Sequence, residues 1–125
     1  GVDVSVDDYA SEVANMLNDE DWEVRMVGCE ALAMMGEKAK DQATRVSAIF
    51  DDERYAVRAR AAHACGKLKD ADSAAGLADL IADNCPTVRE EAMLALAELG
   101  DDGSEYIEKV FEKINDFSPT VRAAA

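Results

Sequence analysis

Apolar residues recur along the chain in two interleaved patterns, and the clearer of the two starts at the dipeptide Val-Arg. This dipeptide begins at Val24, Val57, Val88 and Val121, with spacings of 33, 31 and 33 residues. A small residue stands four positions after each Val. In the first three copies alanine follows at position seven, and further apolar residues follow at positions eight and eleven. These spacings predict an amphipathic helix at each Val-Arg, which we call the first-type helix.

A second apolar pattern precedes each Val-Arg. Seven residues before the Val stand Leu17, Phe50, Ile81 and Ile114, and eleven before it stand Val13, Val46, Leu77 and Val110. This spacing again predicts an amphipathic helix, the second-type helix, so each repeat is a pair of helices. The predicted helices span about 7–18, 22–35, 38–50, 54–68, 71–83, 86–99, 103–115 and 119 onward.

The residues between these helices agree with that division. Gly36 and Gly100 end first-type helices, where a left-handed residue is favoured, and Lys69 takes that place in the middle copy. Pro86 and Pro119 stand where first-type helices open. We expect one domain over residues 1–125, which belongs to a longer array because both ends interrupt a hairpin. Its parts are a second-type helix at 7–18, repeats at about 21–50, 53–83 and 86–115, and the start of a further helix at 119–125.

An aspartate and an arginine recur in step with the apolar pattern, five residues before each Val and directly after it. An Arg in the first turn opposes the helix dipole by roughly 0.3–1 kcal/mol, so its recurrence calls for a compensating partner. The Asp can cap the helix and accept hydrogen bonds from the Arg of its own or the adjacent repeat. We expect a structural Asp-Arg ladder; the alternative is an arginine row that binds a phosphate or carboxylate ligand. The ladder residues are Asp19, Arg25, Asp52, Arg58, Asp83, Arg89, Asp116 and Arg122.

The charge of the chain restricts its partners. The formal net charge is −14, with acidic ends and a basic middle at residues 37–69. This charge repels nucleic acids and anionic membranes, and no apolar run reaches the roughly 20 residues that span a bilayer. We therefore expect no nucleic-acid partner and no direct membrane insertion. The alternative of nucleic-acid binding depends on the basic residues Lys38, Lys40, Arg45, Arg54, Arg58 and Arg60.

The consensus Leu-x-Asp, a short turn, then Val-Arg-x-x-Ala-x-x-Ala-Leu-x-x-Leu-Gly resembles the HEAT repeat. It is most similar to the short variant of phycobilisome lyases, and the resemblance covers essentially the whole chain. It implies an all-α, right-handed α-α superhelix (solenoid) of about 3.5 hairpins, with second-type helices on the concave side. It also implies a non-enzymatic scaffold or adaptor for protein-protein interaction, as a subunit of a larger assembly. The alternative that it brings is a bilin-lyase-like factor that attaches chromophores to phycobiliproteins.

Residues that could support catalysis or metal binding are few. His63 is the single histidine, so a His-ligated metal site has one position to draw on. The turn Asp51, Asp52 and Glu53 lacks the spaced ligands of a calcium loop. Cys29 and Cys65 are expected to pack inside helices, and Cys85, just before a first-type helix, is the candidate for a reactive thiol. We expect no catalytic residue, no metal, no cofactor and no small-molecule substrate.

A solenoid offers a broad surface for a protein partner. On the acidic concave face we expect a basic or amphipathic segment of that partner. Trp22 and Tyr55 are candidate aromatic anchors, or else they fill the junctions between repeats. Unpaired cysteines indicate a soluble intracellular protein, cytoplasmic or in an organellar stroma. The candidate concave contacts are Arg45, Asp72, Asp79, Glu105, Tyr106 and Lys109.

Overall fold

The computed structural model describes residues 6–117, with the side chains of residues 8–112, and this part of the chain folds into helices and short turns without a strand. The first-type helices are α2 (Trp22–Met35), α4 (Tyr55–Leu68) and α6 (Pro86–Glu98). The second-type segments are α1 (Val6–Ala14) with the 3₁₀ helix η1 (Asn15–Asn18), η2 (Gly36–Gln42) with α3 (Ala43–Ser47), η3 (Ala71–Ser73) with α5 (Ala74–Leu80), and α7 (Asp101–Phe117). The predicted all-α architecture is confirmed.

The second-type helices differ in detail from the prediction. The helix expected at 38–50 is a 3₁₀ segment followed by a short α-helix that ends at Ser47, and the one expected at 71–83 ends its α-helix at Leu80. After both ends the chain tightens through bonds from an N–H to the carbonyl three residues back, such as Ile49 to Val46 and Ile81 to Ala78. The apolar spacing is compatible with a continuous α-helix and with a short α-helix flanked by 3₁₀ turns, so it did not distinguish the two.

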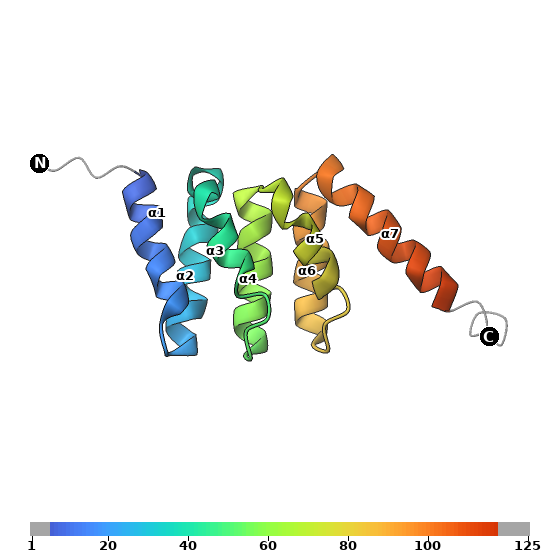
Figure 1. Ribbon diagram of the computed structural model, residues 1–125, viewed down its shortest axis with the longest axis horizontal. Helices are drawn as coiled ribbons and strands as arrows, with labels where there is room; N and C mark the ends of the chain where they lie inside the picture. The colour runs from blue at the N-terminus through green and yellow to red at the C-terminus, as the bar shows by residue number, and fades with distance from the viewer. Residues whose placement is uncertain (1–5, 118–125) are drawn as a thin grey trace, which may run out of the picture.

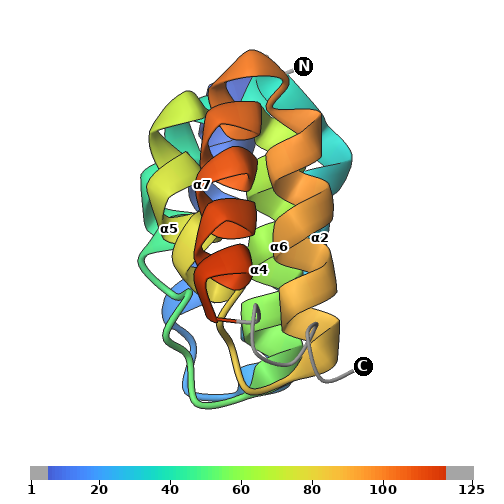
Figure 2. The same ribbon diagram turned by 90° about the vertical axis from the view of Figure 1, so that its right-hand side faces the viewer.

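The helices lie in two layers (Figures 1 and 2). In the end-on view of Figure 2, α5 and α7 lie on one side and α2, α4 and α6 on the other. Within the first-type layer α2 packs on α4 and α4 on α6. The core lies between the layers, and burying each of its large side chains contributes roughly 1.5–3 kcal/mol. Its largest fully buried side chains are Leu17, Leu32, Leu68, Leu77, Leu96, Val46, Val57 and Val88.

Two glycines allow helices to approach closely. A Cβ on Gly66 of α4 would lie 2.8 Å from the Cα of Ala95 on α6, so the two backbones are nearly in contact at this junction. A Cβ on Gly103 would collide with the backbone carbonyl of Leu96, so Gly103 seats the first turn of α7 against the end of α6. At the turn before α5, Lys69 adopts the left-handed conformation with φ 58° and ψ 43°. Gly36 and Gly100 also have positive φ, but Gly36 has ψ −143° and so lies outside the left-handed helical region predicted for it.

We predict that Gly103→Ala displaces α7. The gain in helix propensity from alanine is about 1 kcal/mol, but the collision with Leu96 is with backbone and cannot be relieved by a rotamer change. The free energy of unfolding should fall by about 1–3 kcal/mol, and amide exchange in residues 101–112 should accelerate. The exposed neighbour Ser104 provides the control, since Ser104→Ala should change stability by no more than about 0.5 kcal/mol. Equal effects of the two variants would contradict the account.

Candidate functional site

The recurring Asp and Arg meet across the boundary between consecutive repeats. Arg25 donates from Nε and Nη2 to the two carboxylate oxygens of Asp52, at 2.8 and 3.2 Å. Arg58 binds Asp83 in the same way, at 2.9 and 3.1 Å. The side chains are nearly buried, with exposed fractions of 13% and 7% in the first pair. A bidentate contact of this kind fixes both distance and orientation, so we infer that it helps to set how adjacent hairpins stack.

Each arginine also binds back to its own repeat. In each case Nη1 donates to the backbone carbonyl oxygen of the Asp six residues earlier. The pairs are Arg25 with Asp19, Arg58 with Asp52, and Arg89 with Asp83. The guanidinium of one repeat therefore joins the turn that precedes its own helix to the turn of the next repeat. This use of several donors offsets the unfavourable position of an arginine at a helix start.

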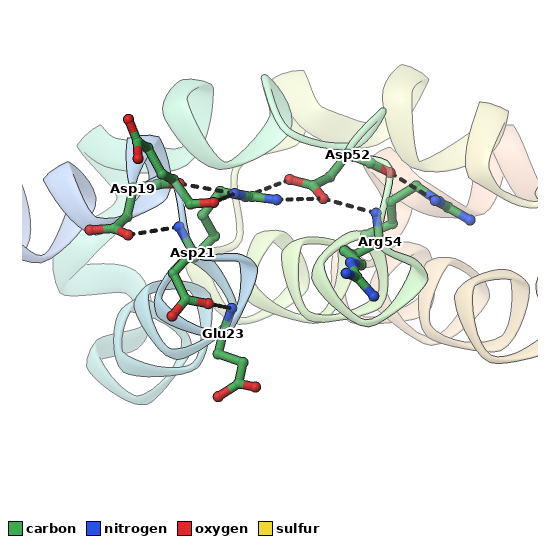
Figure 3. Close-up of polar contacts among 8 residues, drawn as sticks. Asp19, Asp21, Glu23, Asp52 and Arg54 are labelled. Atoms are coloured by element: carbon green, nitrogen blue, oxygen red, sulfur yellow. Dashed lines mark hydrogen bonds and ion pairs between the residues drawn. The ribbon is translucent and has the colours of Figure 1, made fainter.

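The sequence suggested that the ladder aspartates cap the first-type helices, but their side chains do not bind the helix N–H groups directly. Their carboxylates accept from the backbone N–H two residues on: that of Asp21 for Asp19, Arg54 for Asp52, and Cys85 for Asp83. The three residues that donate these bonds stand just before the first-type helices. In α2 the cap itself is Asp21, whose side chain accepts from the N–H of Glu23. Figure 3 shows this chain of turns from Asp19 to Arg54. Each carboxylate is thus oriented by its own turn as well as by an arginine where one binds it.

The electrostatics of Asp52 and Asp83 favour the charged form. Burial alone would raise the pKa of each carboxyl. The arginine of the preceding repeat, a backbone N–H and nearby guanidinium charges outweigh burial and hold both pKa values below the ordinary 3.8. The hydrogen bond to Asp52 raises the pKa of Arg25 and outweighs burial, which lowers it, so the guanidinium stays charged. The pair is therefore ionic at neutral pH.

The outer members of the ladder differ from the inner ones. Asp19 is exposed, and its carboxylate accepts the Asp21 N–H. The side chain of Asp116 and the whole of Arg122 lie outside the described residues, so the contacts expected for them stay predictions. Arg25 and Arg58 are occupied by Asp52 and Asp83, which favours the structural interpretation over a phosphate-binding row.

The cysteines fall into two environments. Cys29 and Cys65 are fully buried, and burial raises the pKa of each thiol to about 12, so neither is a nucleophile at neutral pH. Cys85 is partly exposed at the start of α6, where its N–H is bound by Asp83. The Cys85 side chain is therefore accessible to solvent, as a reactive thiol has to be.

Neither His63 nor the Asp51–Glu53 turn forms a recognisable catalytic or metal site. His63 is partly exposed on α4 and lies 3.4 Å from the carboxylate of Glu91 on α6. Asp52 is already occupied by Arg25, and Asp51 and Glu53 are exposed. Among the residues that the structure describes, no group of three His, Cys, Asp or Glu side chains is arranged to hold a metal ion.

The candidate partner residues of the second-type helices differ in their surroundings. Asp72, Asp79 and Glu105 are exposed on η3, α5 and α7. Lys109 lies 5.1 Å from the ring of Tyr106 and 3.5 Å from Glu105, so these three form one cluster on α7. Arg45 instead contacts the first second-type segment, donating to Asn15 of η1 at 3.0 Å and to the carbonyl of Ser11 of α1. The C-terminal half of this layer therefore presents the acidic surface.

Sequence reasoning missed Phe111, which is 53% exposed on α7. It stands ten residues before a Val of the repeat, a position that holds Ala14, Ser47 and Ala78 in the other copies. A ring at a position meant for a small residue cannot enter the core. The large ring among small residues at the equivalent positions could have revealed Phe111 from the sequence. Phe111 lies one helical turn from the exposed Glu108, so it adds an apolar side chain beside an acidic one.

Ion pairs across the first-type layer were also missed. Arg60 pairs with Glu30 at 2.9 Å and Lys67 with Glu98 at 2.7 Å, which links α2, α4 and α6 across their outer side. These residues line two shallow grooves, and Met34 beside them is 89% exposed. Trp22 is covered by the guanidinium of Arg54, 5.0 Å from the ring centroid, so it lies at a repeat junction, whereas Tyr55 is exposed.

The family model for HEAT repeats matches residues 43–125 of the chain, and the family model for the HEAT repeat matches residues 11–39. The chain belongs to the HEAT repeat family. The resemblance to HEAT repeats is thus confirmed, whereas its lyase-type variant is not supported by these matches. HEAT repeats commonly mediate protein-protein interaction. No curated protein matches the chain, and over its described part no helix of this HEAT protein is long and apolar enough to cross a membrane.

We predict that Asp52→Asn destabilises the fold by about 1–3 kcal/mol at pH 7, because the amide keeps the Arg54 N–H contact but leaves the charge of Arg25 nearly buried and unpaired. The folded-state pKa of Asp52 is depressed, so its contribution is complete above the ordinary aspartate pKa and is lost as the pH falls through the folded-state value. The difference between wild type and variant should therefore shrink below about pH 4.

Urea unfolding at a series of pH values measures both effects. Asp51→Asn is the matched control because Asp51 is the exposed neighbour, and it should change stability by no more than about 0.5 kcal/mol. A difference for Asp52→Asn that stays constant down to pH 2 would show that the ion pair is not its source.

Proposed function

We propose that this HEAT protein is a non-enzymatic scaffold that binds a basic, amphipathic segment of a partner protein through the acidic part of its second-type layer. We call this part the α5–α7 surface, formed by Asp72, Asp79, Glu105, Tyr106, Lys109 and Phe111. The proposal is supported by a difference in environment between the acidic residues of this surface and those of the ladder. Asp52 and Asp83 are bound by arginine, whereas Asp72, Asp79 and Glu105 are exposed.

The charge distribution on α7 indicates the chemistry of the partner. Asp101, Asp102, Glu105, Glu108 and Glu112 are all exposed, and Lys109 is the one basic residue among positions 101–112. Acidic carboxylates around an exposed ring complement a helix with basic and apolar faces, because the charges steer the encounter and the ring provides a buried contact. In Figure 2, α5 and α7 lie side by side, so a single segment can contact both.

The chromophore-attachment alternative receives no such support. The family matches identify HEAT repeats without a lyase type. We therefore do not adopt it.

A charge-reversal experiment tests the proposal. A fluorescein-labelled synthetic helix with lysines on one face and leucines on the other should bind the wild-type chain, with anisotropy as the readout. The triple variant Asp72→Lys, Asp79→Lys and Glu105→Lys should weaken that binding by roughly tenfold or more, because it removes the complementary charges.

The matched control is Glu20→Lys, Glu53→Lys and Glu90→Lys, which makes the same change in net charge at exposed positions away from the α5–α7 surface. It should weaken binding by no more than about threefold, through long-range electrostatics alone. Circular dichroism checks that both triples remain folded. Equal losses in the two triples, or no binding to wild type, would refute the α5–α7 surface.

A further inference from the structure

The outer side of the first-type layer carries a shallow groove between α4 and α6. Its apolar lining comes from Leu94, Ala95 and Ala97 of α6. Leu94 is 54% exposed and stands six residues after the Val, a position that holds Glu30 and His63 in the other copies. An exposed leucine that replaces an ionisable residue beside a groove marks a candidate contact surface. We call this surface the α4–α6 face, formed by Arg60, His63, Lys67, Glu91, Leu94 and Glu98.

The charges of the α4–α6 face form two rows of opposite sign. Positions three and ten after the Val hold Arg60 and Lys67 on α4, but Glu91 and Glu98 on α6. All four side chains are partly exposed. The two helices lie side by side and run in the same direction (Figure 1). Lys67 and Glu98 are 2.7 Å apart, so equivalent positions of α4 and α6 lie at about the same height.

This arrangement of charges is complementary to itself. A two-fold axis that runs along the groove, parallel to the helices, places α4 of one copy over α6 of a second copy and leaves every residue at its own height. Lys67 then faces Glu98 of the second copy, and Arg60 faces its Glu91. At the height between these charges, His63 faces the Leu94 of the second copy. Each contact occurs twice because the interface is symmetric.

The neighbouring groove between α2 and α4 lacks this complementarity. The same operation there would place Arg60 against Val27 and Lys67 against Met34, so neither base would meet an acid. Two chains of net charge −14 also repel each other at long range. On the α4–α6 face two bases offset two acids, so the repulsion is locally reduced where the copies would meet.

We propose that the α4–α6 face is a self-association site through which two copies of the chain form a symmetric dimer. The site lies on the layer opposite to the α5–α7 surface (Figure 2). A dimer therefore leaves both α5–α7 surfaces open, and they point away from each other. This proposal goes beyond the scaffold function and does not depend on it, but together they make the scaffold bivalent.

Sedimentation equilibrium of the full chain over a concentration series measures the association. The wild type should approach the mass of two chains at its highest concentrations. Leu94→Lys should weaken the dimer by roughly tenfold or more, because it places a charge in the apolar centre of the interface. Met34→Lys is the matched control, since Met34 is an even more exposed apolar residue of the same layer and the charge change is identical. It should alter the association by no more than about threefold.

A pair of charge reversals tests the two-fold register. Lys67→Glu surrounds the axis with four carboxylates and Glu98→Lys with four ammonium groups, so each variant alone should associate at least about tenfold more weakly than wild type. An equimolar mixture of the two variants places unlike charges across the interface again and should regain the dimer. The Lys67–Glu98 pair within one chain cannot explain such a rescue, because each variant chain still lacks it.

Circular dichroism checks that every variant is folded. A wild type that stays monomeric throughout the series overturns the proposal. Equal effects of Leu94→Lys and Met34→Lys, or a mixture that stays monomeric, overturn the α4–α6 face as the site. The lysine–leucine helix that probes the α5–α7 surface should bind Leu94→Lys as it binds wild type, so this proposal and the scaffold function fail separately.

Discussion

One contact recurs at every junction that the structure describes fully: a guanidinium that joins two repeats. Arg25 and Arg58 each hold the carbonyl of their own turn and both carboxylate oxygens of the next turn. Apolar burial supplies most of the stability, but it is non-directional and tolerates sliding of one hairpin against the next. The charged, bidentate contact is directional, so we infer that it selects one stacking register among those that the apolar faces allow.

Close packing accompanies that contact. At the α4–α6 junction, Gly66 lets the two backbones approach near the ends of the helices, and Arg58 binds Asp83 near their starts. The same contact separates two classes of acid in a chain of net charge −14. Asp52 and Asp83 are paired with arginines within the stack, whereas the acids of α5 and α7 are exposed.

The sequence predicted the fold well because a 31- to 33-residue period and helical spacing are local signals that each copy repeats. It identified Asp and Arg as recurring, but it did not decide whether Arg25 would take the carboxylate of Asp19 or of Asp52, because that choice depends on the angle between hairpins. The pairs Arg60–Glu30 and Lys67–Glu98 were missed for another reason. Their positions hold different residue types in each copy, so no recurrence marked them.

We infer that the Arg25–Asp52 contact contributes more to the junction than an ordinary surface ion pair does. A double-mutant cycle with Arg25→Gln and Asp52→Asn, followed by urea unfolding at pH 7, measures their coupling directly. We expect a coupling free energy of about 1.5–3 kcal/mol, typical of hydrogen bonds to charged groups with little exposure. The exposed pair Arg60–Glu30 should give about 0.2–1 kcal/mol. Equal coupling in the two pairs would show that the Arg25–Asp52 contact contributes no more than a surface ion pair.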